Sequence, residues 1–381
     1  MIAITNAKIV LEYGVIWNGV ILVEDGKIAK VGKTDEITIP QGAEIYDANA
    51  LYVGPGFVDI HVHGGGGHIL HEEPESGAEH FLKHGETTIL AALYYDLSKE
   101  EFLSAIERVK NSMKKDGASK SIAGIYMEGP YMNPKYGASP EKNKWCGEIK
   151  STDYMPIIKE AGDLAKVWAI APERDGIEDF LKDAKKENPT AMISVGHSEA
   201  TPDEIKKLKK YGIGLQTHCM NATGRPFATP GTRSCGPDEA CLMDKDMYAE
   251  IICDSCGIHI PADLLRMIVE IKGVDKVVLI TDSTVSESQS PESLRHITDL
   301  NFDDNGNLYG STLTMDAACR NLLMHTNCGI TQAFLMASRN PAKVIGMADE
   351  VGTIEKGKRA NLVFVDDMFN VKKVMLQGKF Y

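Results

Sequence analysis

Apolar runs and amphipathic segments alternate through the middle of the chain. Eight apolar runs have the length and β-branched content of buried strands, at residues 57–62, 86–93, 121–127, 165–171, 191–195, 212–217, 248–252 and 276–281. Segments with helical periodicity lie between and after them, at residues 99–115, 152–160, 176–187, 202–210, 261–271, 315–325 and 331–337. Strands that alternate with helices predict a parallel α/β architecture, and eight of them favour a closed TIM-like (β/α)8 barrel.

Local signals support two of these helices and one insertion. Ser98 and Thr201 precede helical segments as N-cap residues, and Pro202 follows Thr201 at the first helical position. Residues 292–308 resemble an inserted hairpin after the last strand, with its turn at residues 304–307.

The two ends of the chain have a different pattern, with short strand-like runs separated by turn residues. These runs fall at residues 2–11, 15–23, 27–31 and 44–48, and again at residues 360–366 and 371–376. We expect residues 1–52 and 355–381 to fold together as a small β-sandwich domain. Residues 53–354 would then form the barrel.

Composition narrows the class of protein. The chain has 381 residues, 43% of them hydrophobic, and a formal net charge of −13, which argues against a general surface for nucleic acid or anionic membranes. No apolar run approaches the length of a bilayer span, and the first ten residues lack the pattern of a signal peptide. We therefore expect a cytoplasmic protein with reduced cysteines; Cys253 and Cys256 form a C-x-x-C without a second pair.

Six chemically active side chains stand at the ends of predicted strands. His61 and His63 share one face of the first strand, because residues i and i+2 point the same way. The other four end later strands and are Glu128, His197, His218 and Asp282. A lone His-x-His is as often a pair of polar residues as a ligand pair. In a (β/α)8 barrel, however, all these strand ends face one mouth, so we predict a metal site that suits zinc or iron.

These residues carry a family resemblance. Residues 55–63, the Glu128-Gly129-Pro130 step, Gly196-His197-Ser198, Thr217-His218 and Thr281-Asp282 resemble the metal-dependent amidohydrolase superfamily. Within it the chain is most similar to the family of N-acetylglucosamine-6-phosphate deacetylases, over its whole length. The resemblance implies a metal-dependent hydrolase of linear amides in amino-sugar metabolism, active as a homodimer.

The resemblance also assigns roles. Glu128, His197 and His218 would hold the principal divalent ion, and His61 and His63 a second one, with one or two ions per subunit. Asp282 would be the general base and acid. Ala138, Asn221, Ala222, Arg225, His259, Thr312 and Leu313 would contact the substrate, with His259 near the dimer interface.

The loop after His218 departs from the family pattern. Relatives place a phosphate-binding arginine where this chain has Ala228, so Arg225 or Arg233 would have to substitute for it. Substrates that remain open are N-acetylglucosamine 6-phosphate, N-acetylgalactosamine 6-phosphate, an unphosphorylated N-acyl sugar and a different amide. The alternative to an enzyme is a metal-binding sensor barrel, although such a barrel has no need of Asp282 beside the metal.

Overall fold

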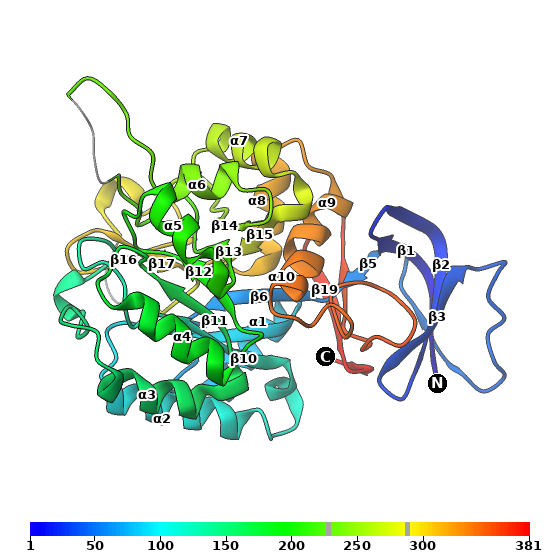
Figure 1. Ribbon diagram of the computed structural model, residues 1–381. Coiled ribbons are helices and arrows are strands. Elements are labelled where there is room, and N and C mark those ends of the chain that lie inside the picture. The colour runs from blue at the N-terminus through cyan, green and yellow to red at the C-terminus, as the bar shows by residue number, and fades with distance from the viewer. Residues whose placement is uncertain (226–229, 286–289) are drawn as a thin grey trace.

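A (β/α)8 barrel forms most of the computed structural model, which describes residues 1–225, 230–285 and 290–381 (Figure 1). Its parallel strands lie side by side in chain order and are β6 (Phe57–Val62), β9 (Glu86–Tyr94), β10 (Ile122–Glu128), β11 (Ala165–Ile170), β12 (Met192–Val195), β13 (Ile213–Gln216), β14 (Tyr248–Ile252) and β15 (Val277–Ile280). The sheet closes at its carboxyl end, where the Asp282 N–H donates to the His61 carbonyl at 2.9 Å and the His63 N–H to the Ser283 carbonyl at 2.8 Å. The predicted eight-stranded barrel is confirmed.

The barrel strands are apolar because both of their faces are covered. Every residue of β6 and β15 is buried, and the helices surround the sheet in Figure 1. These helices are α1 (Pro74–Lys83), α2 (Lys99–Ser112), α3 (Ser151–Ala161), α4 (Ile177–Glu187), α5 (Pro202–Leu208), α6 (Pro237–Met243), α7 (Ala262–Lys272), α8 (Met315–His325), α9 (Ile330–Phe334) and α10 (Asn340–Val344). A π-helical turn, Leu335–Arg339, joins α9 to α10. Of the helices in the described ranges, none is both long and apolar enough for a bilayer crossing.

Short elements complete the barrel. Single 3-10 turns cover Gly117–Ser121, Pro140–Lys142, Gly162–Leu164, Lys209–Tyr211, Val274–Lys276 and Glu292–Leu294. Two small hairpins lie at its mouth, β7 (Gly64–Gly65) with β8 (His68–Ile69), and β16 (Leu300–Phe302) with β17 (Leu308–Ser311). The inserted hairpin is therefore shorter than predicted and begins at Leu300. Helices α1 and α6 were absent from the sequence prediction.

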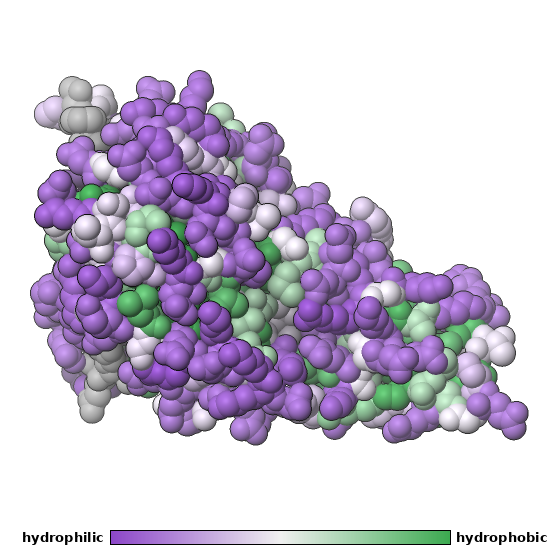
Figure 2. Space-filling model, turned by 60° about the horizontal axis from the view of Figure 1, so that its bottom comes forward, coloured by the Kyte–Doolittle hydropathy of each residue, from purple (hydrophilic) through white to green (hydrophobic). Residues whose placement is uncertain are grey.

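A separate sheet contains both ends of the chain and lies beside the barrel (Figure 1). Its strands are β1 (Ile2–Leu11), β2 (Gly14–Glu24), β3 (Lys27–Lys33), β4 (Glu44–Asp47), β5 (Tyr52–Pro55), β18 (Leu362–Val365), β19 (Val371–Leu376) and β20 (Lys379–Phe380). The C-terminal β18 pairs with β5, so strands from the two ends share one ladder. Hydrophilic side chains cover most of the face in Figure 2, where the narrower part built on this sheet is distinct from the barrel. The domain limits at residues 52 and 355 stay a prediction.

Candidate active site

The six candidate side chains meet at the carboxyl mouth of the barrel. His61 lies in β6 and His63 follows it, Glu128 is the last residue of β10, and His197, His218 and Asp282 follow β12, β13 and β15. The last three adopt left-handed backbone conformations, with φ angles of 45°, 27° and 49°. Such conformations are costly for residues other than glycine and cluster at functional sites. They turn these side chains out of the strand direction and toward one another.

Glu128, His197 and His218 form the tighter group. The Oε1 atom of Glu128 lies 2.8 Å from Nε2 of His197 and 3.1 Å from Nε2 of His218, and these two nitrogens are 3.0 Å apart. The Nδ1 atoms face backbone carbonyls at 3.3 and 3.2 Å. A carbonyl only accepts hydrogen bonds, so each neutral ring carries its proton on Nδ1 and a lone pair on Nε2. Three lone pairs that converge at about 3 Å repel one another unless a cation lies between them.

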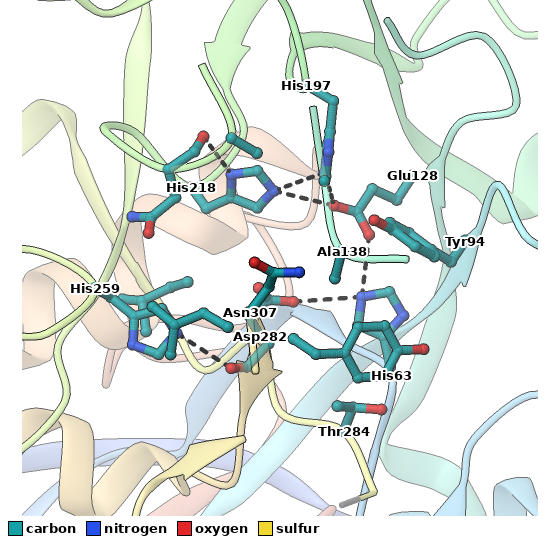
Figure 3. Close-up of a pocket in the computed structure, with 17 residues that line it drawn as sticks. His63, Tyr94, Glu128, Ala138, His197, His218, His259, Asp282, Thr284 and Asn307 are labelled. Carbon is teal, nitrogen blue, oxygen red and sulfur yellow. Dashed lines mark hydrogen bonds and ion pairs between the residues drawn. The ribbon is translucent and has the colours of Figure 1, made fainter. Parts of the chain in front are cut away.

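A second group shares the same carboxylate. The Oε2 atom of Glu128 lies 3.1 Å from Nε2 of His63 and 3.4 Å from Nε2 of His61. The ring of His61 directs its other nitrogen, Nδ1, to Glu250 at 3.1 Å, and its buried Nε2 atom has no hydrogen-bond partner among the residues that the structure describes. Such an unsatisfied buried atom fits a metal ligand. Glu128 thus presents one oxygen to each group, as a bridging carboxylate does (Figure 3).

The electrostatics of the site also favour bound cations. Burial lowers the pKa of His63, but Asp282 and Glu128 outweigh burial and raise it to about 9. Burial raises the pKa of Glu128, yet the imidazoles of His61, His197 and His218 hold it well below its ordinary value. The metal-free site therefore takes up protons to balance its two carboxylates. A divalent ion supplies the same positive charge, and the donor set of imidazoles and one carboxylate suits zinc or iron.

Asp282 stands beside the second group. Its Oδ1 atom lies 3.3 Å from Nε2 of His63 and 3.7 Å from Nε2 of His61. Burial raises the pKa of Asp282, but these imidazoles outweigh burial and keep it below its ordinary value. The carboxylate is ionised at neutral pH and can accept a proton from a water molecule in the cavity.

A cavity of about 320 Å³ opens over the site. Four of the expected substrate-contacting residues line it, Ala138, Asn221, Ala222 and His259, and their contact with a substrate stays a prediction. Figure 3 shows Ala138 and His259 at the cavity. The ring of His259 is held between Asp254, 3.1 Å from Nδ1, and the carbonyl of Gly310, 3.1 Å from Nε2.

Three predicted substrate residues lie outside the cavity lining. The guanidinium of Arg225 donates to Glu239 at 2.7 Å, and this ion pair keeps it in the loop after β13. Thr312 donates instead to the Thr298 carbonyl at 2.8 Å, and Leu313 is buried in the barrel core. Of the alternatives for phosphate, Arg233 is exposed and 3.5 Å from Glu239, and position 228 lies outside the described residues.

The cavity is also lined by residues that were not predicted from the sequence. They are Tyr94, Gly137, Ile252, Thr284, Asn307, Leu308, Tyr309 and Gly310. Tyr94 is the last residue of β9, so the rule that strand ends face the mouth was a signal for it. Asn307 to Gly310 come from the hairpin that folds over the cavity, and no strand-end rule places a hairpin.

Comparison with known proteins agrees with this geometry. The model of the amidohydrolase family matches residues 52–381. The chain therefore belongs to the amidohydrolase family and is a hydrolase, and metal dependence is a property of that family.

Particular relatives match along the whole chain. An N-acetylglucosamine-6-phosphate deacetylase of Bacillus subtilis (strain 168) is 30% identical over 98% of this chain and 96% of its own. An N-acetylgalactosamine-6-phosphate deacetylase of Escherichia coli O157:H7 is 28% identical over 98% and 97%. The crystal structure of N-acetylglucosamine-6-phosphate deacetylase from Pasteurella multocida superimposes with a TM-score of 0.87 at 25% identity, covering 100% of this chain and 99% of that one.

Proposed function

We propose that this protein hydrolyses the acetamide of N-acetylglucosamine 6-phosphate to glucosamine 6-phosphate and acetate. The observation that carries the proposal is the meeting of Glu128, His197 and His218 with Asp282 in one buried cavity. The names of the relatives support the choice of an N-acetylated amino-sugar phosphate. We further propose zinc or iron as the metal, with one or two ions per subunit. The family resemblance supports a cytoplasmic homodimer.

The chain's own residues supply the proton transfers of this reaction. A divalent ion held by Glu128, His197 and His218 would polarise the amide carbonyl and make water reactive near neutral pH. Asp282 accepts the proton of the attacking water and then delivers it to the amide nitrogen. The second transfer is needed because an amine leaves poorly unless it is protonated. Ala138, Asn221 and His259 hold the sugar over the carboxylate.

One observation favours a second candidate, an unphosphorylated N-acetyl amino sugar. Among the described residues that line the cavity, none is lysine or arginine, and residues 226–229 and 286–289 contain neither. Phosphate sites are commonly built with these side chains or with backbone N–H groups. The backbone N–H groups near Asn221 and Ala222 would have to supply the phosphate contacts of the leading candidate.

An acetate-release assay tests both candidates. The zinc- or iron-loaded enzyme is given N-acetylglucosamine with and without the 6-phosphate, and N-acetylgalactosamine 6-phosphate, with the Asp282→Asn variant as the background. The leading proposal requires the highest kcat/KM on N-acetylglucosamine 6-phosphate. A higher value on the unphosphorylated sugar selects the second candidate. Metal binding without acetate release from any of them contradicts amino-sugar deacetylation and favours a sensor or another amide.

A further inference from the structure

Glu250, in the middle of β14, is a buried carboxylate that the proposed reaction does not use. Glu250 is fully buried, and burying a carboxylate is costly unless polar groups replace the water that it loses. Its Oε2 atom lies 3.1 Å from Nδ1 of His61, accepts the N–H of His218 at 3.1 Å, and accepts the hydroxyl of Tyr126 at 3.4 Å. One carboxylate oxygen therefore contacts both candidate ligand groups.

The contact with His61 determines which ring nitrogen is available to a metal. A carboxylate only accepts, so the proton of a neutral His61 ring lies on Nδ1 and the lone pair on Nε2. That Nε2 atom is buried, has no hydrogen bond within the described part of the chain, and lies 3.4 Å from the Glu128 carboxylate and 3.7 Å from that of Asp282. The ring of Tyr126 stacks on the ring of His61 with centroids 4.2 Å apart, which restricts its rotation. A carboxylate on Nδ1 also makes the Nε2 lone pair more basic.

The contact with His218 acts through the backbone. His218 has a φ of 27°, a strained conformation that persists only where neighbours hold it. The Glu250 side chain accepts the N–H of His218, and the Glu250 carbonyl accepts the next N–H, from Cys219, at 2.8 Å. The turn that directs His218 toward Glu128 is thus held from β14 at two successive backbone groups.

We infer that Glu250 is a positioning residue that couples the two ligand groups, through the ring of His61 and through the backbone turn of His218. The inference rests on the proposed metal site. Replacing the carboxylate by an amide would weaken the group of His61 and His63 selectively, because an amide on Nδ1 makes the Nε2 lone pair of His61 less basic than a carboxylate does. The amide oxygen can still accept the N–H of His218. Loss of the whole side chain would weaken both groups.

Zinc titrations of three variants test this difference. The weaker zinc site of the wild type is assigned to the His61 and His63 group if it is lost in His61→Asn. Glu250→Gln is expected to lower zinc affinity at that site by about 10- to 100-fold. The affinity at the principal site stays within about twofold. Glu250→Ala is expected to lower both affinities. Equal affinities in the wild type and Glu250→Gln, or an equal loss at both sites in that variant, would overturn the inference.

Glu86→Gln is the matched control. Glu86 is also fully buried in the barrel, and each of Glu86 and Glu250 has one carboxylate oxygen without a hydrogen-bond partner among the described residues. The other oxygen of Glu86 accepts the N–H of Met315. Burial and the nearby Asp59 carboxylate raise its pKa well above the ordinary value. Both zinc affinities should be unchanged in Glu86→Gln. A fall at the His61 and His63 group in this variant as well would show a general effect of the barrel interior.

Two outcomes separate this inference from the proposed function. A wild-type enzyme that binds no zinc or releases no acetate contradicts the function, whereas the inference is judged from the variants of a protein that binds zinc. If the Glu250 variants do not fold, a measurement on the wild type still tests the inference. In zinc-loaded wild type with ¹⁵N-labelled histidine, the His61 ring should show a protonated Nδ1, assigned by its loss in His61→Asn. Zinc bound through Nδ1 would overturn the inference.

Discussion

Asp282 is the residue on which the proposed mechanism depends most directly. Its carboxylate lies 3.3 Å from Nε2 of His63. The amide of an asparagine at this position can make part of the same contact. Asp282→Asn should therefore keep bound metal and substrate affinity while turnover falls by about 10² to 10⁴, the usual contribution of general acid–base catalysis. Metal analysis, substrate binding and kcat measured on the same preparation check this. Near-normal turnover would remove Asp282 from the mechanism.

The meeting of the candidate ligand residues could be predicted because it depends on one simple fact, that parallel strands of a barrel end at the same mouth. The position of His197 and Glu128 at the end of an apolar run was enough to predict that they lie at this mouth. Arg225 could not be placed in this way, because the direction of an exposed arginine depends on its ion partner, here Glu239 in a later helix. No pattern in the sequence marks that pairing in advance.

At the scale of an element, the loop after β14 depends on Asp254. Its carboxylate accepts the backbone N–H groups of Cys256, Ile258 and His259, and it lies 3.1 Å from the ring of His259. Burial raises the pKa of Asp254, but these hydrogen bonds lower it to about 2, below its ordinary value of 3.8. The folded state therefore binds this proton less readily than the unfolded state. The resulting stability is complete above pH 4 and is lost as the pH falls toward 2.

Asp254→Asn should therefore lower the free energy of unfolding by about 1–2 kcal/mol at pH 7, because an amide replaces the charge of this buried carboxylate. The difference from the wild type should shrink between pH 4 and pH 2. Urea unfolding at several pH values measures it. A difference that stays constant over this range would show that the charge of Asp254 is not the cause.

The start of α2 gives a second prediction at this scale. The Ser98 hydroxyl accepts the N–H of Glu101 at 3.3 Å, and the Glu101 carboxylate accepts the N–H of Ser98 at 2.7 Å, which is a capping box. Ser98→Ala should destabilise the helix start by about 1 kcal/mol. Hydrogen exchange of the first-turn amides measures this locally. Ser104→Ala, in the exposed interior of the same helix, is the control and should leave these rates unchanged.

Capping residues marked the starts of two helices in the sequence, although α8 also has its predicted bounds, residues 315–325, without a side-chain cap. Ser98 and Thr201 both form the capping boxes of their helices, and the predicted starts are confirmed. Helices α1 and α6 were not predicted, although Pro74 and Pro237 stand in their first turns and Glu239 accepts the N–H of Gly236 at 2.9 Å; Glu73 makes no capping hydrogen bond, and α6 has seven residues. Packing against the barrel stabilises them, and packing is not visible in a local pattern.

At the scale of the whole molecule, the candidate metal site and the folded barrel depend on one another. Glu128, His197 and His218 come from three different strand ends, and they bring repelling lone pairs together in the metal-free protein. A bound ion relieves this repulsion only while the barrel is folded. Binding to the folded state alone stabilises it by about 4 kcal/mol when free metal exceeds its Kd by 1,000-fold.

Removal of the metal should therefore lower the thermal midpoint of the whole barrel by roughly 5 °C, given an unfolding entropy of about 2.1 cal/mol/K for each residue. Scanning calorimetry with and without a chelator measures this shift, and zinc added back should restore it. Glu128→Gln should lose the shift because both ligand groups share this carboxylate. His80→Gln, on α1 away from the cavity, should keep it. An equal zinc shift in both variants would place the stabilising ion elsewhere in the molecule.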